Sequence, residues 1–169
     1  INNHIVMDNN NILQKMEALR LHGMYNLYKN MLDTNQYESL TNEELLTVLI
    51  NAEWDNKENK RIDRYVTLAK FRYRATIENI RYDDDRELDR SLIMRLADCS
   101  FIKQSKNILI TGLTGTGKSY LASAFGYQAC YNGYKVVYFN AQKMFAKLKS
   151  AKADGTYNKL INRIAKQDL

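Results

Sequence analysis

The sequence is poor in the two residues that interrupt helices. Its 169 residues include no proline and only seven glycines, although average usage would place about eight prolines in such a chain. Because proline breaks helix interiors and glycine weakens them, this scarcity favours helix. Apolar residues make up 45% and charged residues 26% of the chain, which excludes a collagen-like or wholly disordered protein.

Cysteine and histidine are also scarce. Cys99 and Cys130 stand 31 positions apart, a spacing typical neither of a disulfide framework nor of a zinc site. His4 and His22 have no cysteine or acidic residue at ligand spacing, so we assign them no metal. We expect both cysteines to be buried, reduced thiols.

Long apolar runs are absent as well. No stretch of about 18 apolar residues occurs, and the first eleven residues are largely polar, so the sequence predicts neither a membrane span nor a secretory signal. We therefore expect a cytoplasmic protein with no membrane partner.

Charge is distributed unevenly along the chain. The net charge is +6, yet residues 1–55 hold three basic and eight acidic side chains, which leaves 22 basic and 11 acidic ones in the remainder. A basic surplus attracts polyanions such as nucleic acid or an anionic membrane surface. Charge alone does not choose between these partners.

The helical spacing of apolar residues lapses at an acidic cluster, Tyr82–Arg86. We therefore predict two domains, an all-helical N-terminal domain over 1–82 and a second domain over 83–169. In the first, Thr41 and Glu44 have the spacing of a capping box, which predicts that a helix of about 35 residues begins there.

This predicted helix carries a row of cations. Lys57, Lys60, Arg61 and Arg64 stand at offsets of 0, 3, 4 and 7, which places them on one helix face. Such a row is most often a solvated face whose charges pair locally, but it can also follow the phosphates of a nucleic acid.

One segment carries a specific motif. Gly112–Ser119 has the sequence Gly-Leu-Thr-Gly-Thr-Gly-Lys-Ser and satisfies the P-loop (Walker A) pattern G-x-x-x-x-G-K-[ST] at every required position. The run Asn107–Thr111 before it is typical of a buried strand, and Tyr120–Tyr131 after it is typical of a helix. Strand, loop and helix therefore follow in the order of a phosphate-binding loop.

The residue types of this loop fit a nucleoside triphosphate. Glycines permit positive φ and leave main-chain N–H groups open to phosphate oxygens. The lysine can reach the outer phosphates and the serine hydroxyl can bind Mg²⁺, so we predict ATP and Mg²⁺ as cofactors. The predicted nucleotide contacts are Gly112, Leu113, Thr114, Gly115, Thr116, Gly117, Lys118, Ser119 and Tyr120, with Ser119 also the metal ligand.

The rest of the second domain predicts part of a nucleotide-binding fold. Lys135–Phe139 is a candidate second strand. The expected fold class is therefore α/β, a P-loop NTPase with a parallel sheet flanked by helices, truncated after about two strands and preceded by the all-helical domain. Asp154 and Asp168 are the only acids after Ser119 and neither follows an apolar strand, so we assign no catalytic residue and leave hydrolysis by this chain open.

Together these segments resemble the IstB family, the ATP-binding helper proteins of insertion sequences, which are AAA+ ATPases related to bacterial helicase loaders. The resemblance begins near Leu13 and rests on the loop and on further segments. These segments are Leu19–Met24, Ala52–Asp55, Glu58–Arg61, Lys70–Arg72, Ala75–Glu78, Leu88–Arg90, Gly133–Tyr134 and Ala151–Gly155.

The resemblance implies an ATPase in the intact protein, self-association into an oligomer on double-stranded DNA, and delivery of a transposase to that DNA. It also implies that basic residues of the helical domain contact the DNA. The candidate contacts are Lys57, Lys60, Arg61, Arg64, Lys70, Arg72 and Arg74.

Three alternatives use the same loop. A helicase loader would have a helicase as its partner, and neighbouring genes would separate it from a transposition helper. A small-molecule kinase would need an arginine-bearing lid beside the phosphates, whereas roughly a hundred helical residues precede this loop. A non-hydrolysing scaffold would hold ATP without turnover.

Overall fold

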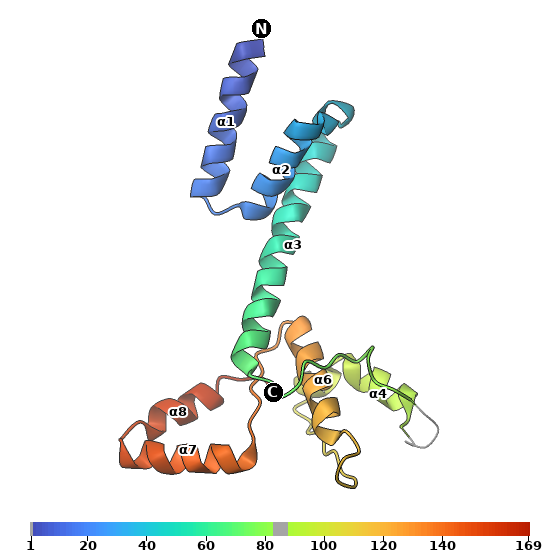
Figure 1. Ribbon diagram of the computed structural model, residues 1–169, viewed down its shortest axis with the longest axis vertical. Helices are drawn as coiled ribbons and strands as arrows, with labels where there is room; N and C mark the ends of the chain where they lie inside the picture. Colours follow the sequence, from blue (N-terminus) through green and yellow to red (C-terminus); the bar gives the residue numbers. More distant parts are fainter. Residues whose placement is uncertain (1, 83–87) are drawn as a thin grey trace. The chain divides into compact units, whose positions relative to one another are not determined.

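The computed structural model describes the backbone of residues 2–82 and 88–169, and side chains from residue 9 onward except 37, 38 and 83–87. The chain forms two compact units, Ile1–Arg61 and Ile62–Leu169 (Figure 1). Most of the acidic cluster at which we place the domain boundary lies outside the described residues. The two-domain division at residue 82 stays a prediction.

Helices make up the regular structure that is described. The first unit contains α1 (Asn2–Ala18), α2 (His22–Thr34), the short 3-10 helix η1 (Gln36–Ser39) and the start of α3 (Asn42–Ala69). The second unit contains the end of α3, then α4 (Arg90–Ala97), α5 (Ser100–Lys103), α6 (Lys118–Tyr131), α7 (Ala141–Ala153) and α8 (Tyr157–Ile164). None of the described helices is both long and apolar enough to cross a membrane.

The capping box at the start of α3 is confirmed. The Glu44 N–H donates to Thr41 Oγ1 at 3.3 Å, and the Thr41 N–H donates to Glu44 Oε2 at 2.8 Å. The bonds that the Thr41 N–H and the Thr41 hydroxyl donate to Oε2 lower the pKa of the Glu44 carboxyl, since they favour its charged form. The helix is shorter than expected, because Lys70 adopts a left-handed φ of 56° and ends it.

The α/β fold class expected from the sequence is wrong for the residues that the structure describes, which include helices but no strand and therefore no parallel sheet. Both predicted strands, 107–111 and 135–139, lack regular secondary structure. In the second segment, the Val137 N–H donates to the Leu169 carbonyl and the Tyr138 N–H to the Ala69 carbonyl. A strand needs a ladder of such bonds to a neighbouring strand. The apolar, β-branched pattern does not show whether such a neighbour is present, and in 107–111 it does not produce burial either, since Leu109 is 88% exposed.

Helices α2 and α3 approach each other closely at Gly23. A Cβ atom on Gly23 would lie 2.3 Å from the Ala52 carbonyl oxygen and 2.7 Å from the Glu53 Cα atom. Figure 1 shows α2 running beside the first part of α3. Only a residue without a side chain permits this approach.

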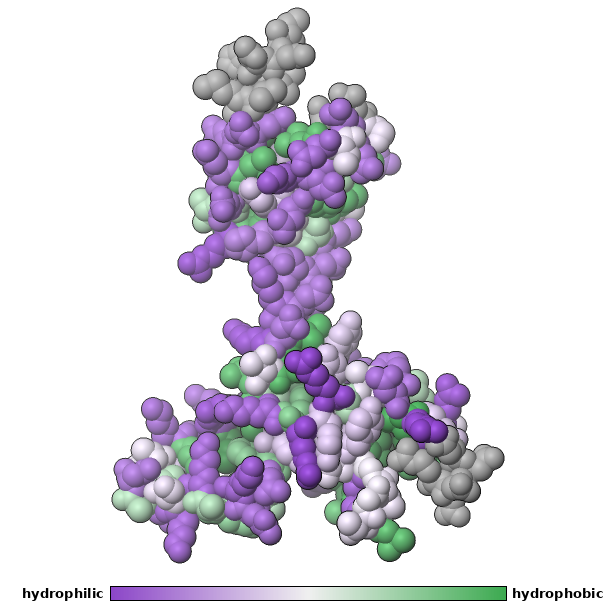
Figure 2. All heavy atoms as spheres, viewed as in Figure 1, coloured by the Kyte–Doolittle hydropathy of each residue, from purple (hydrophilic) through white to green (hydrophobic). Residues whose placement is uncertain are grey.

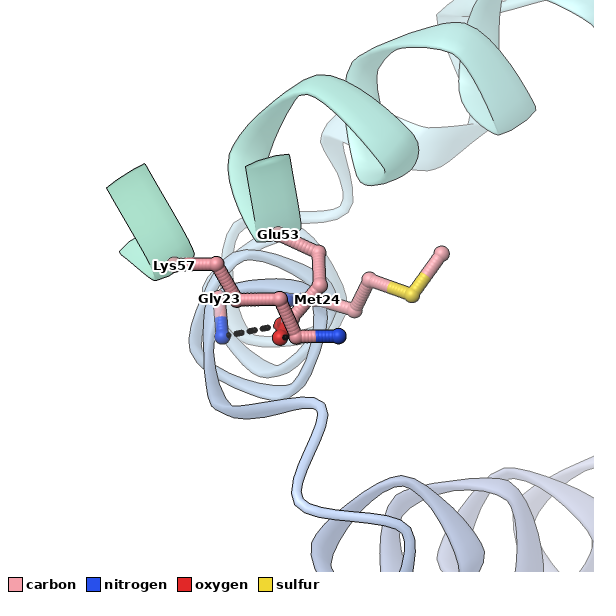
Figure 3. A network of polar contacts seen from close by, with 4 residues as sticks. All are labelled: Gly23, Met24, Glu53 and Lys57. Atoms are coloured by element: carbon pink, nitrogen blue, oxygen red, sulfur yellow. Dashed lines mark hydrogen bonds and ion pairs between the residues drawn. The ribbon is translucent and has the colours of Figure 1, made fainter. Parts of the chain in front are cut away.

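Glu53 of α3 caps the start of α2 at the same place (Figure 3). Its Oε2 atom accepts hydrogen bonds from the N–H groups of Gly23 at 2.7 Å and Met24 at 3.2 Å. Because Leu21, the N-cap residue, offers no side-chain cap, the buried carboxylate satisfies amides that a helix start leaves unpaired. Lys57 Nζ, 3.5 Å from Oε1, supplies the countercharge.

The core of the second unit is built along α6. Two apolar clusters of buried residues contact this helix from different sides. The first cluster contains Ala75, Ile77, Ile80, Ile93, Ala97, Ala124 and Phe125, and the second contains Ala69, Cys99, Phe101, Ala129, Cys130 and Val136. Gly126 lies between these contacts, and a Cβ atom there would be 2.5 Å from the Phe71 ring. The helix is therefore fixed along most of its length.

Gly23→Ala should destabilise the first unit by about 2 kcal/mol, because the added methyl group would overlap backbone atoms that cannot rotate away. At a helix position with free space, Gly→Ala would stabilise the fold by about 1 kcal/mol. The sign of the change in unfolding free energy therefore shows whether Gly23 is closely packed. Urea unfolding followed by circular dichroism measures the difference. Lys29→Ala, at an exposed position of α2, is the control and should shift stability by less than about 0.5 kcal/mol. A Gly23→Ala chain as stable as the unmodified one would contradict this packing.

The expectation of two buried thiols is confirmed. Burial raises the pKa of Cys130 to about 11 and also raises that of Cys99, so near neutral pH both are protonated and unreactive. Ellman's reagent should modify the folded chain only as slowly as the second unit opens, and the urea-unfolded chain at once. Rapid modification of the folded chain would show that this core is not closed.

Candidate functional site

The phosphate-loop segment joins directly onto α6. Gly115 and Gly117 have φ angles of 87° and 89°, a left-handed conformation that glycine adopts without strain. Gly117 is the N-cap of α6 and offers no side-chain cap. The first-turn N–H groups of the helix, which lack intrahelical partners, therefore adjoin the loop.

Two side chains fold back over the loop. Thr116 Oγ1 donates to the Leu113 carbonyl oxygen at 2.9 Å, and Lys118 Nζ donates to the same oxygen at 2.5 Å. The Lys118 ammonium therefore lies against the loop, five residues upstream of its own position. An anion held by this loop would be within reach of that charge.

Both ends of the loop are anchored in the core. Upstream, Ile108 packs against the second apolar cluster and Ile110 against the first. Downstream, Tyr120 packs against the first cluster, with its ring centroid 6.3 Å from that of Tyr73. Exposed loop residues thus connect two fixed points, which limits the conformations that the loop can adopt.

The predicted nucleotide contacts form one continuous turn, from Gly112 to the first turn of α6. Leu113, Thr114 and Thr116 are exposed, whereas Ser119 and Tyr120 are half-buried. The Ser119 carbonyl accepts a hydrogen bond from Ser123 Oγ at 2.8 Å, and the Ser119 hydroxyl is the predicted metal ligand. The role of each residue stays a prediction.

The two acids that follow the loop in sequence are held by their own neighbours. Asp154 accepts hydrogen bonds from the Thr156 hydroxyl at 2.6 Å and the Thr156 N–H at 3.0 Å, which lower its pKa. Asp168 accepts from the Lys135 N–H at 2.8 Å. Among the described residues, no group of three or more His, Cys, Asp or Glu side chains could hold a metal ion.

The cations predicted on the long helix lie on α3, which is unbroken from residue 57 to residue 64. Figure 2 shows a hydrophilic surface along the middle of this helix. Lys57 pairs with Glu53, Arg61 forms an ion pair with Glu58, and the Arg64 guanidinium lies 5.6 Å from the Tyr65 ring centroid. The contacts of Arg61 and Arg64 are exposed and contribute little stability, whereas Lys57 pairs with a buried carboxylate.

The remaining three predicted DNA contacts follow α3. Lys70 and Arg72 line a groove of about 900 Å³ in the second unit, and Arg74 is exposed nearby in sequence. Three further cations from α7 and α8 line the same groove, and its lining residues, all of them described, include no acid. These additional cations are Lys143, Lys147 and Arg163.

Sequence reasoning missed those three cations. Lys143 and Lys147 stand four residues apart and therefore share a face of α7, a signal present in the sequence. Arg163 belongs to another helix, and no sequence pattern brings it to Lys70. The groove is a second surface with several cations, in addition to the row on α3.

Comparison with known proteins identifies the family. Residues 14–169 match the family described as IstB-like ATP binding protein. The chain is 33% identical over 148 residues to an insertion sequence ATP-binding protein, y4pL, of Sinorhizobium fredii, covering 88% of this chain and 60% of that protein. It is 34% identical over 158 residues to an ATP-binding protein of insertion sequence IS1162 from Pseudomonas fluorescens, covering 93% of this chain and 68% of the relative.

The chain is also 29% identical over 148 residues to an ATP-binding protein of insertion sequence IS5376 from Geobacillus stearothermophilus, covering 88% of this chain and 59% of that protein. The chain thus spans about three fifths of the length of most of these relatives. The family match covers nearly the whole chain and confirms the resemblance indicated by the sequence. The chain belongs to the IstB-like ATP-binding protein family.

Proposed function

We propose that the chain binds ATP through residues 112–120 as part of a DNA-binding helper protein of an insertion sequence. The observation that carries this proposal is the Gly112–Ser119 loop at the start of a firmly packed helix, with Lys118 folded over it. Amide groups, a helix N-terminus and an ammonium group together favour a polyphosphate. The names of the relatives add ATP and the insertion sequence, which favours a transposition helper over a helicase loader.

Each loop residue has a separate task in this proposal. Gly115 and Gly117 give the backbone its turn, so that main-chain N–H groups face the phosphates. Lys118 exchanges the Leu113 carbonyl for a phosphate oxygen, which is a stronger, charge-assisted acceptor. Helix α6 keeps these donors in place before ATP arrives, which lowers the entropy lost on binding.

Ser119 fits a magnesium ion that accompanies ATP. Mg²⁺ keeps several water ligands and takes few protein ligands beside the phosphate oxygens, so one hydroxyl in the first turn of α6 is a sufficient local contribution. A bound Mg²⁺ would neutralise phosphate charge. Hydrolysis further requires groups that orient water and stabilise the developing charge, and we attribute ATPase activity to the intact protein alone.

DNA is the proposed second polyanion. Four cations of α3, five in the groove of the second unit and the exposed Arg74 are the residues that would contact its phosphates. Contacts of this kind depend on salt and little on base sequence. Self-association on DNA and delivery of a transposase complete the proposed function, as the family resemblance implies.

Lys118→Ala should weaken ATP–Mg²⁺ binding by about 10- to 100-fold, because a charged hydrogen bond contributes roughly 1.5–3 kcal/mol. Isothermal titration calorimetry of the full chain measures the affinity. Lys159→Ala, which removes the same charge from an exposed position of α8, is the matched control and should bind like the unmodified chain. Equal affinities of the Lys118→Ala and Lys159→Ala chains would reject the nucleotide site.

Removing two cations from either basic surface should weaken binding to duplex DNA. The variants Lys60→Ala/Arg64→Ala and Lys143→Ala/Lys147→Ala should each make the slope of log affinity against log salt shallower by about two, since each lost phosphate contact changes it by about one. Fluorescence anisotropy at several salt concentrations measures this slope. Lys103→Ala/Lys106→Ala removes the same charge elsewhere and should leave it unchanged.

If all three double variants behaved alike, general charge and no specific surface would hold the DNA. The DNA contacts would then be wrong, whereas the ATP site, measured by calorimetry without DNA, would be unaffected. If only one of the two surfaces responded, that surface alone would be the contact.

A further inference from the structure

Helix α3 exposes a row of three large apolar side chains in the first unit. Leu46, Ile50 and Trp54 are 57%, 49% and 71% exposed. They stand four residues apart, so they share one face of the helix. Single exposed apolar residues are ordinary, but a contiguous row that includes tryptophan is typical of an interaction surface.

This row is not part of the packing between α2 and α3. The face of α3 that carries Leu49 and Glu53 is buried, and Glu53 bonds to the start of α2. The apolar row adjoins this buried face, yet its three side chains stay largely exposed. Folding of the first unit therefore does not account for these three side chains.

Opposite charges flank the row at equal distances. Glu43 precedes Leu46 by three residues and Lys57 follows Trp54 by three, and both are exposed. The face therefore carries an acid, three apolar residues and a base, with spacings of three, four, four and three. Lys57 is oriented by its contact with Glu53, while its side chain stays 63% exposed.

This order of side chains complements the same face of a second copy only when the two helices run in opposite directions. With Ile50 on a two-fold axis, Leu46 of each copy faces Trp54 of the other and Glu43 faces Lys57. A parallel pairing would instead place Glu43 against Glu43 and Lys57 against Lys57, which is repulsive. An antiparallel pair has two-fold symmetry, the commonest symmetry of protein dimers.

We propose that two copies of this chain associate through α3, antiparallel, with the two-fold axis at Ile50. The overlap from Glu43 to Lys57 is about 21 Å long, at 1.5 Å of rise per residue. The apolar row forms its centre and the two charge pairs form its ends. This surface deepens the self-association within the proposed function, but it needs neither ATP nor DNA.

Cysteine cross-linking tests the axis. Ile50→Cys should form disulfide-linked dimers rapidly under mild oxidation, because the two copies of residue 50 meet there. Val48→Cys, exposed on another face of α3, is the matched control and should cross-link at least about tenfold more slowly. Cys99 and Cys130 are buried and do not compete. The full chain is used, with and without ATP, so that this result is independent of nucleotide binding.

A mixing experiment tests the direction of the helices. Two copies of residue 46 would lie about 12 Å apart along the helix axis in the antiparallel pair, too far for a disulfide. Neither Leu46→Cys alone nor Trp54→Cys alone should therefore cross-link efficiently, whereas an equimolar mixture of the two should. Circular dichroism of each variant confirms that its helices are retained.

Three results would overturn the proposal. Equal cross-linking of Ile50→Cys and Val48→Cys would indicate random collision. Efficient cross-linking of Leu46→Cys with itself would indicate a parallel pair. Sedimentation of the unmodified chain as a monomer at all concentrations would mean that this row meets a different protein.

Discussion

The position of α6 is the constraint on which the site depends. A phosphate-binding loop works only if its amides face one point before the ligand arrives. Here, the contact of Phe71 with Gly126 and two apolar clusters fix the helix that follows the loop, while Ile108 and Ile110 fix the segment that precedes it. The loop itself needs few contacts of its own, because both of its ends are held.

Close approach at a glycine also organises the first unit. Gly23 lets α2 touch the backbone of α3, and Glu53 then caps the helix start that this approach buries. Helix α3 also carries an exposed apolar row and a row of cations, and Lys57, which contacts Glu53, belongs to the cation row and also flanks the apolar row.

The sequence predicted the parts of the molecule that local patterns determine. The loop, the start of α6 and the capping box at Thr41 depend on residues within a few positions of one another, so spacing identifies them. The strands were predicted wrongly. In Asn107–Thr111 Leu109 is 88% exposed, and in Lys135–Phe139 the N–H groups of Val137 and Tyr138 bond to two separate segments in place of one neighbouring strand. The Glu53 cap on Gly23 and the groove shared by Arg163 and Lys70 join residues far apart in sequence, and no local pattern encodes them.

Hydrogen–deuterium exchange of the full chain tests the nucleotide site most directly, because it reports on individual main-chain amides. The account predicts that ATP with Mg²⁺ slows exchange at residues 113–120, and that adenosine, which lacks phosphates, does not. Unchanged exchange at these residues with saturating ATP, or equal protection by adenosine, would contradict it.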